Sequence, residues 1–153
     1  MSQSAGEVQV LSGTAAGGLR WEVSCSGDDE DLYTILRVYS GDVRVVAGSG
    51  FGGPKLQPGS VMKEWRGRTD DLPYFVMART VPAVTRVVAT TDRGADVVLE
   101  LSDPVERFGL RFAAAALPPG HMPAKITAKR DGTVLEEQPQ PMPPPALRRR
   151  GSA

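Results

Sequence analysis

The sequence predicts an all-β fold, most simply an antiparallel β-sandwich of roughly eight to ten short strands, with an antiparallel barrel as the alternative. The first observation is alternation: over residues 19–26, Leu, Trp, Val and Cys alternate with Arg, Glu and Ser. A period of two is typical of a strand with one buried face and one wet face. The second observation is that no stretch keeps a helical period for longer than about two turns.

In the first half of the chain, alternating segments with β-branched and aromatic residues indicate strands, and clusters of glycine, serine and aspartate indicate turns. The run at 74–81 is apolar over most of its length, which predicts a more fully buried strand, and Pro82 ends it. Residues 48–60 are rich in glycine and proline and are predicted to form a long loop. The strands predicted in this half are 8–11, 19–26, 32–39, 43–47, 61–65 and 74–81.

The second half follows the same pattern with clearer turns. Asp103-Pro104 ends one strand, Pro118–Gly120 turns the chain, and Asp131-Gly132 predicts a two-residue hairpin. Residues 113–117 are compatible with a single turn of helix and nothing longer. The strands predicted in this half are 84–91, 95–102, 108–112, 124–129 and 133–136.

The chain of 153 residues is predicted to hold one domain over residues 6–137, followed by a disordered tail rich in proline and arginine over residues 138–153. A domain of this size can bury enough apolar surface to fold without disulfides or metals. The tail has little to bury, and its prolines cannot donate hydrogen bonds to a sheet. Within it, Pro143–Pro145 suits a partner groove that accepts polyproline.

The charges are balanced, with 18 Lys and Arg residues against 18 Asp and Glu residues. The arginines, Arg79 and Arg86 among them, are dispersed and are expected mostly on water-exposed strand faces. A nucleic-acid-binding protein gathers its cations on one element, so neither nucleic acid nor a membrane surface is an expected partner. The chain shows neither a signal peptide nor an apolar run long enough to span a membrane, and a cytoplasmic location is therefore expected.

Residues Gly48–Gly53 match the G-x-G-x-x-G pattern of dinucleotide-binding proteins. That pattern works at the start of a helix, whose N-terminus faces the pyrophosphate. Here Pro54, Pro58 and Gly59 follow, so no such helix is predicted. We expect a loop at this position and not a nucleotide site.

Other residues that could carry chemistry are few. Asp28–Asp31 could offer oxygens to calcium, but contiguous acids lack the alternating ligands and central glycine of a calcium loop. His121 and Cys25 are the only histidine and cysteine, too few for a zinc site, and Cys25 lies on a predicted buried face. We therefore predict no catalytic, cofactor-binding or metal-binding residue and no cofactor.

The predicted function is a non-enzymatic protein-interaction or scaffolding module with an unidentified protein partner. Trp65 lies among arginines, a combination typical of interface anchors, although its ring could instead end a strand in the core, as is expected of Trp21. The candidate partner-binding residues are Trp65, Arg66, Arg68, Arg148, Arg149 and Arg150.

Two alternatives stay open. A small-ligand or carbohydrate-binding sandwich would expose Trp65 or Tyr74 in a concave patch. An enzyme would assemble carboxylates, such as Glu100 and Asp103, that are distant in sequence but close in space.

Over residues 82–135, the strands at Val84–Val87 and Phe108–Phe112 and the turns at Pro119-Gly120 and Asp131-Gly132 follow one another at short intervals. This pattern resembles small β-sandwich domains of uncharacterised actinobacterial proteins, and the arginine- and alanine-rich composition suits such a source. The resemblance covers about a third of the chain and implies the sandwich fold but no activity.

Overall fold

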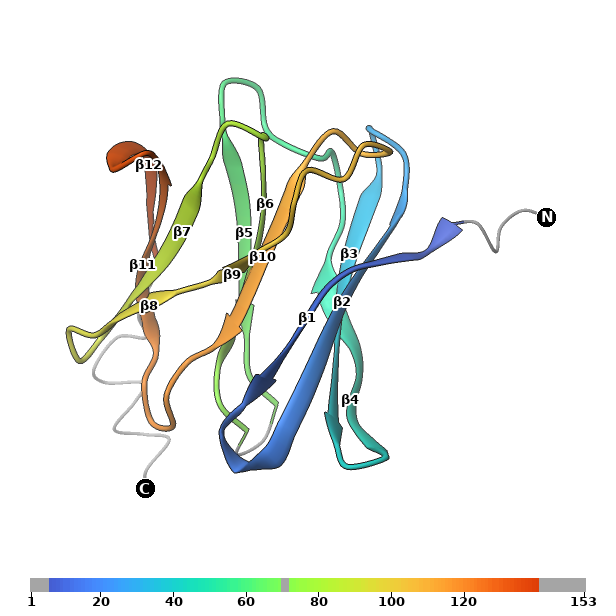
Figure 1. Ribbon diagram of the computed structural model, residues 1–153, viewed down its shortest axis with the longest axis vertical. Coiled ribbons are helices and arrows are strands. Elements are labelled where there is room, and N and C mark those ends of the chain that lie inside the picture. Colours follow the sequence, from blue (N-terminus) through green and yellow to red (C-terminus); the bar gives the residue numbers. More distant parts are fainter. Residues whose placement is uncertain (1–5, 70–71, 141–153) are drawn as a thin grey trace, which may run out of the picture.

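The computed structural model describes residues 6–69 and 72–140, which form twelve β-strands and one short 3₁₀ turn. The strands lie in three antiparallel sheets of four strands each (Figure 1). The N-terminal sheet has the order β1-β2-β3-β4, with β1 at Val8–Ala15, the turn η2 at Ala16–Gly18, β2 at Leu19–Gly27, β3 at Leu32–Ser40 and β4 at Val43–Phe51. The central sheet has the order β5-β6-β10-β9, with β5 at Met62–Gly67, β6 at Phe75–Thr80, β10 at Arg111–Ala116 and β9 at Glu100–Leu101. The C-terminal sheet has the order β12-β11-β7-β8, with β12 at Thr133–Pro139, β11 at Pro123–Arg130, β7 at Arg86–Thr91 and β8 at Asp96–Val98.

Figure 1 shows the central sheet between the other two, so the fold is a sandwich of three layers, with core residues packed on both faces of the central sheet. Strand β6 is buried along its whole length because both faces of its sheet are covered. Its residues Val76 and Ala78 belong to the core against the C-terminal sheet, and Phe75 and Met77 to the core against the N-terminal sheet. The predicted antiparallel sandwich and its fully buried strand are confirmed. The barrel alternative is wrong, because the sheets remain open.

One predicted strand, 95–102, divides between two sheets. Residues before Leu99 form β8 in the C-terminal sheet, and those after it form β9 in the central sheet. Leu99 itself is buried, and its backbone N–H donates to Val87 O at 2.9 Å. The chain thus passes from one layer to the next at a single buried residue, which alternation alone does not reveal.

Strand β4 extends through four of the six residues of the glycine-rich motif, so the prediction of a loop starting at residue 48 is wrong. A Cβ on Gly48 would lie 2.8 Å from the Ile35 side chain, and one on Gly52 would lie 3.3 Å from the Tyr33 ring. These glycines therefore leave room for side chains of the neighbouring strand β3. No helix follows, so the motif has a packing role.

Boundaries also shift around β10, which begins at Arg111 and not at residue 108. Phe108 and Leu110 are buried just before it, in a turn closed by a bridge between Val105 and Leu110. The predicted helical turn at 113–117 is instead mostly strand. Ala113–Ala116 pair with β6, and Ala113 and Ala114 are buried in the central sheet.

The end of the domain lies later than predicted. Asp131 and Gly132 have φ values of 48° and 87°, as a two-residue hairpin of the predicted kind requires. Strand β12 then runs to Pro139, and the buried Gln140 donates through its backbone N–H to Ala124 O at 2.9 Å. The domain therefore passes the predicted boundary at 137, and the rest of the predicted tail lies outside the described residues. The described part of the chain includes no helix with the length and apolarity to cross a membrane.

Candidate functional site

The site forms where the edge strand β5 leaves the central sheet. Successive residues of a strand point to opposite faces, so Trp65 turns toward the N-terminal sheet and Arg66 toward the C-terminal sheet. Trp65 is half-buried against the core between the N-terminal and central sheets. A Cβ on Gly67 would lie only 2.5 Å from two ring atoms of Trp65, so glycine at this position lets the indole lie flat over the strand.

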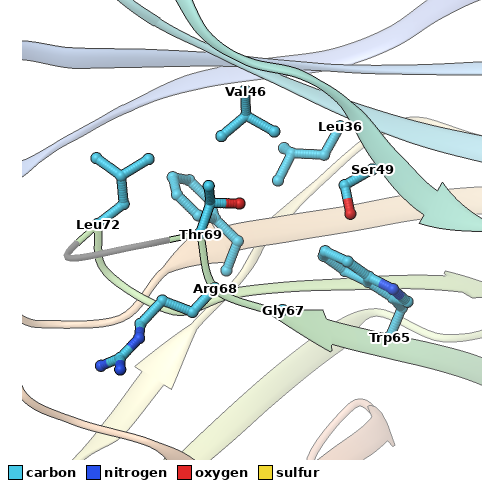
Figure 2. Close-up of a pocket in the computed structure, with 9 residues that line it drawn as sticks. Leu36, Val46, Ser49, Trp65, Gly67, Arg68, Thr69 and Leu72 are labelled. Carbon is cyan, nitrogen blue, oxygen red and sulfur yellow. The ribbon is translucent and has the colours of Figure 1, made fainter.

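Beside this indole is a pocket with a cavity volume of about 90 Å³. Figure 2 shows that it lies between β4 and the segment that follows β5, with Trp65 at one side and Leu72 at the other. Its polar lining comes from Ser49 and Thr69, and Arg68 lies at its rim pointing away from the indole. The lining residues are Leu36, Val46, Ser49, Trp65, Gly67, Arg68, Thr69, Leu72 and Phe75.

The predicted cluster of Trp65 with its arginines is divided by the fold. The Arg68 guanidinium lies 5.1 Å from the centre of the Tyr74 ring, a cation–π contact at the rim. Arg66 donates to Pro123 O at 3.2 Å and so ties β5 to the C-terminal sheet. Of the candidate residues Trp65, Arg66 and Arg68, two therefore line the pocket, Trp65 and Arg68. Arg148, Arg149 and Arg150 lie outside the described residues.

The aromatic residues predicted as a sugar platform are not the most exposed ones. Trp65 and Tyr74 are half-buried, and Arg68 covers the Tyr74 ring. Among the described aromatic side chains, the most exposed is Tyr33, at 43%, whose ring lies beside Gly52. Alternation predicts that Tyr33 lies on a wet face, but not that a glycine lies beside it.

The sequence did not indicate a second polar centre, which surrounds Arg79. Arg79, expected on a water-exposed face, is fully buried between the N-terminal and central sheets, so that expectation is wrong. Its guanidinium donates to the side chain of Thr34 at 2.8 Å and stacks on the Phe51 ring at 4.4 Å. It also donates to the backbone oxygens of Gly52, Gly53, Pro54 and Lys55 at 3.2, 3.4, 2.9 and 2.8 Å.

The groups that accept hydrogen bonds from Arg79 are uncharged: they are one hydroxyl and four backbone carbonyl groups. Lys63 adds a second cation, donating to Gly52 O at 2.7 Å and Pro54 O at 3.2 Å. Burial lowers the pKa of Arg79 to about 10, which leaves it charged at neutral pH, and burial together with the Arg79 charge lowers the pKa of Lys63. The arginine therefore holds the glycine-rich loop by its carbonyl groups. A charged residue inside the apolar run 74–81 was the available signal.

The remaining sequence candidates have structural partners. Asp28 accepts from the backbone N–H groups of Glu30 and Asp31 at 3.1 and 3.0 Å, and Asp29 pairs with Lys55 at 3.2 Å. The described residues contain no group of three His, Cys, Asp or Glu side chains placed to hold a metal ion. Cys25 is buried as predicted, and burial raises the pKa of its thiol.

His121 contacts the buried Thr91, with 2.9 Å between Nδ1 and Oγ1. The Thr91 oxygen already accepts the backbone N–H groups of Arg93 and Ala95, both at 3.2 Å. Its single proton is therefore free to be donated to Nδ1.

We predict that neutral His121 carries its proton on Nε2, because Nδ1 accepts the Thr91 proton. The ¹⁵N chemical shifts of the ring measure this. A neutral ring protonated on Nδ1 would contradict the assignment. In the variant Thr91→Val, the preference for this tautomer should weaken.

No protein-family model matches the chain, and no curated protein or solved structure is significantly similar to it.

Proposed function

We propose that this protein is a non-enzymatic binding module that takes one apolar side chain of a protein partner into the pocket beside Trp65. The observation that carries the proposal is the pocket itself, an indole-walled opening between two sheets. Tryptophan and arginine are enriched among the residues that contribute most to binding at protein interfaces. Arg68, which the sequence also made a candidate partner-binding residue, supplies a cation at the rim of the pocket.

The volume of the pocket limits its occupant. An apolar cavity of about 150 Å³ holds a benzene molecule, so one of about 90 Å³ suits a smaller group. The branched end of a Leu, Ile or Val side chain fits this description. The pocket-lining residues the structure describes carry no carboxylate, imidazole or thiol, which favours binding over acid–base or nucleophilic chemistry there.

A titration with isobutanol, which mimics a leucine side chain, tests whether the pocket accepts this group. We expect the indole N–H resonance of Trp65 to shift, with a dissociation constant on the order of millimolar. Trp21 is an internal control, because its indole is buried and donates to Thr14 O at 3.3 Å. Equal shifts of both indoles, or no shift of Trp65, would contradict the proposal.

Filling the pocket tests whether a protein partner uses it. The variant Ser49→Leu should occupy the space beside Trp65 and abolish retention of any partner that the wild-type protein captures from a host lysate. Ser26→Leu is the matched control, because Ser26 lies on β2 and is not part of the pocket lining. A partner retained equally by both variants binds elsewhere, and the proposal then fails.

The predicted contribution of Arg148, Arg149 and Arg150 is tested by truncation after Gln140. An earlier truncation would remove the buried Gln140, whose side chain donates to Glu64 at 2.8 Å and joins two sheets. A partner lost on truncation after Gln140 would support the role of these arginines, and one fully retained would exclude it. The cytoplasmic location and the actinobacterial source stay predictions.

Carbohydrate binding is the second candidate, and the exposed ring of Tyr33 favours it. Its neighbour Gly52 adds no side chain to obstruct a sugar ring stacking there. Tyr33→Ala would remove glycan binding if this candidate were correct, while leaving the isobutanol titration of Trp65 unchanged.

A further inference from the structure

Figure 1 shows the hairpin that joins β11 to β12 at one end of the C-terminal sheet. A separate cleft lies beside this hairpin. Its volume is about 390 Å³, and its lining consists of Thr85, Arg86, Lys129, Asp131 and Gly132. Nothing in this cleft belongs to the Trp65 pocket, which lies between the other two sheets.

The pairing of strands places two cations opposite each other in this cleft. Lys129 of β11 is the direct partner of Arg86 of β7. Like charges at directly opposed positions of an antiparallel pair destabilise it. Four residues earlier on β11, by contrast, Lys125 has a partner of opposite charge and forms an ion pair with Glu137 at 3.4 Å.

Neither cation of the cleft is neutralised within the described part of the chain. The ion pairs of 4.0 Å or less involve other residues, and the side chains of Arg86 and Lys129 have neither a hydrogen-bond partner nor an ion-pair partner there. Asp131 lines the same cleft, but its carboxylate lies beyond that distance from both cations. The fold therefore holds two positive charges together at an open cleft.

Thr85 adds a neutral donor. Its Oγ1 accepts the backbone N–H of Asp131 at 2.8 Å, and the acceptor for its own proton is Lys129 O, 3.5 Å away. A hydrogen bond of that length is at the limit of the usual range and weak. The hydroxyl proton can therefore turn toward a ligand in the cleft at little cost.

We propose that this cleft is a binding site for a phosphate-type oxyanion held between Arg86 and Lys129. A guanidinium offers a planar fork that contacts two oxygens of a tetrahedral anion, and an ammonium contacts a third. The Thr85 hydroxyl supplies a further neutral donor. A bound dianion also removes the repulsion between the two cations, so binding and folding of this end of the sheet support each other.

Inorganic phosphate is the probe, compared with chloride at constant ionic strength and pH. Phosphate should shift the backbone amide resonances of Asp131 and Gly132 in a saturable manner and raise the melting temperature. In Arg86→Gln and Lys129→Gln, the affinity should fall about tenfold, as expected for loss of one charge-assisted contact. Lys125→Gln is the matched control and should bind phosphate like the wild-type protein, because Lys125 already has a carboxylate partner.

Phosphate also stabilises proteins generally, because it is excluded from their surfaces. A double-mutant cycle between Arg86 and Lys129 separates the two effects. In chloride the coupling of the two cations should be unfavourable, and in phosphate it should become favourable because they share one ligand. Equal stabilisation of all variants by phosphate, or unsaturable amide shifts, would show a general salt effect and overturn the proposal.

Discussion

Replacing Arg79 with methionine is expected to destabilise the protein by about 2–4 kcal/mol. Methionine fills a similar volume but removes the donors to two groups, the Lys55 carbonyl and the buried Thr34 hydroxyl, while the carbonyls of Gly52 and Pro54 keep the Lys63 donor. Each buried polar group left unsatisfied costs about 1–3 kcal/mol. Urea unfolding followed by circular dichroism measures the change.

The variant Arg79→Lys shows whether geometry or charge is decisive. A lysine keeps the charge but lacks the planar fork that reaches several carbonyl oxygens together, so most of the stability should still be lost. Arg20→Met is the control, because its side chain is 48% exposed on the N-terminal sheet and should change stability by less than about 0.5 kcal/mol. If Arg79→Met matched this control, the network around Arg79 would not be what holds the loop.

Replacing Trp21 with alanine is the second large effect, with an expected cost of about 3–5 kcal/mol. Only 1% of Trp21 is exposed, and the indole lies so close to β1 that a Cβ on Gly13 would be 2.3 Å from it. Removing the ring therefore leaves a cavity that the rigid sheets cannot close. Thermal and urea unfolding of the purified variant provide the measurement.

Trp65→Ala should cost about half as much, because its half-buried ring leaves space that opens to solvent. A folded Trp65→Ala protein that no longer captures its partner would support the anchor role. If Trp65→Ala instead cost as much as Trp21→Ala, the ring would serve the core, and the proposed anchor would lose its basis.

The candidate site shows what alternation can and cannot predict. Trp65 was a candidate because of its arginine neighbours in sequence, yet alternation alone implies that Arg66 points to the opposite face. The pocket depends on Leu36 and Val46 of another sheet, and no local pattern indicates that they lie opposite Trp65. Likewise, the repulsion between Arg86 and Lys129 exists only through strand register, which brings together residues far apart in the chain.

Local patterns in the sequence were enough to predict the all-β class, the buried Trp21 and Cys25, the fully buried strand β6 and the hairpin at Asp131-Gly132. These features follow from local alternation, run length and turn chemistry, which act between residues close in the chain. The third layer, the change of sheet at Leu99 and the burial of Arg79 depend instead on how the sheets pack together. A charged side chain can be buried only where carbonyl groups from another segment converge on it, and that convergence arises from the packing of whole sheets.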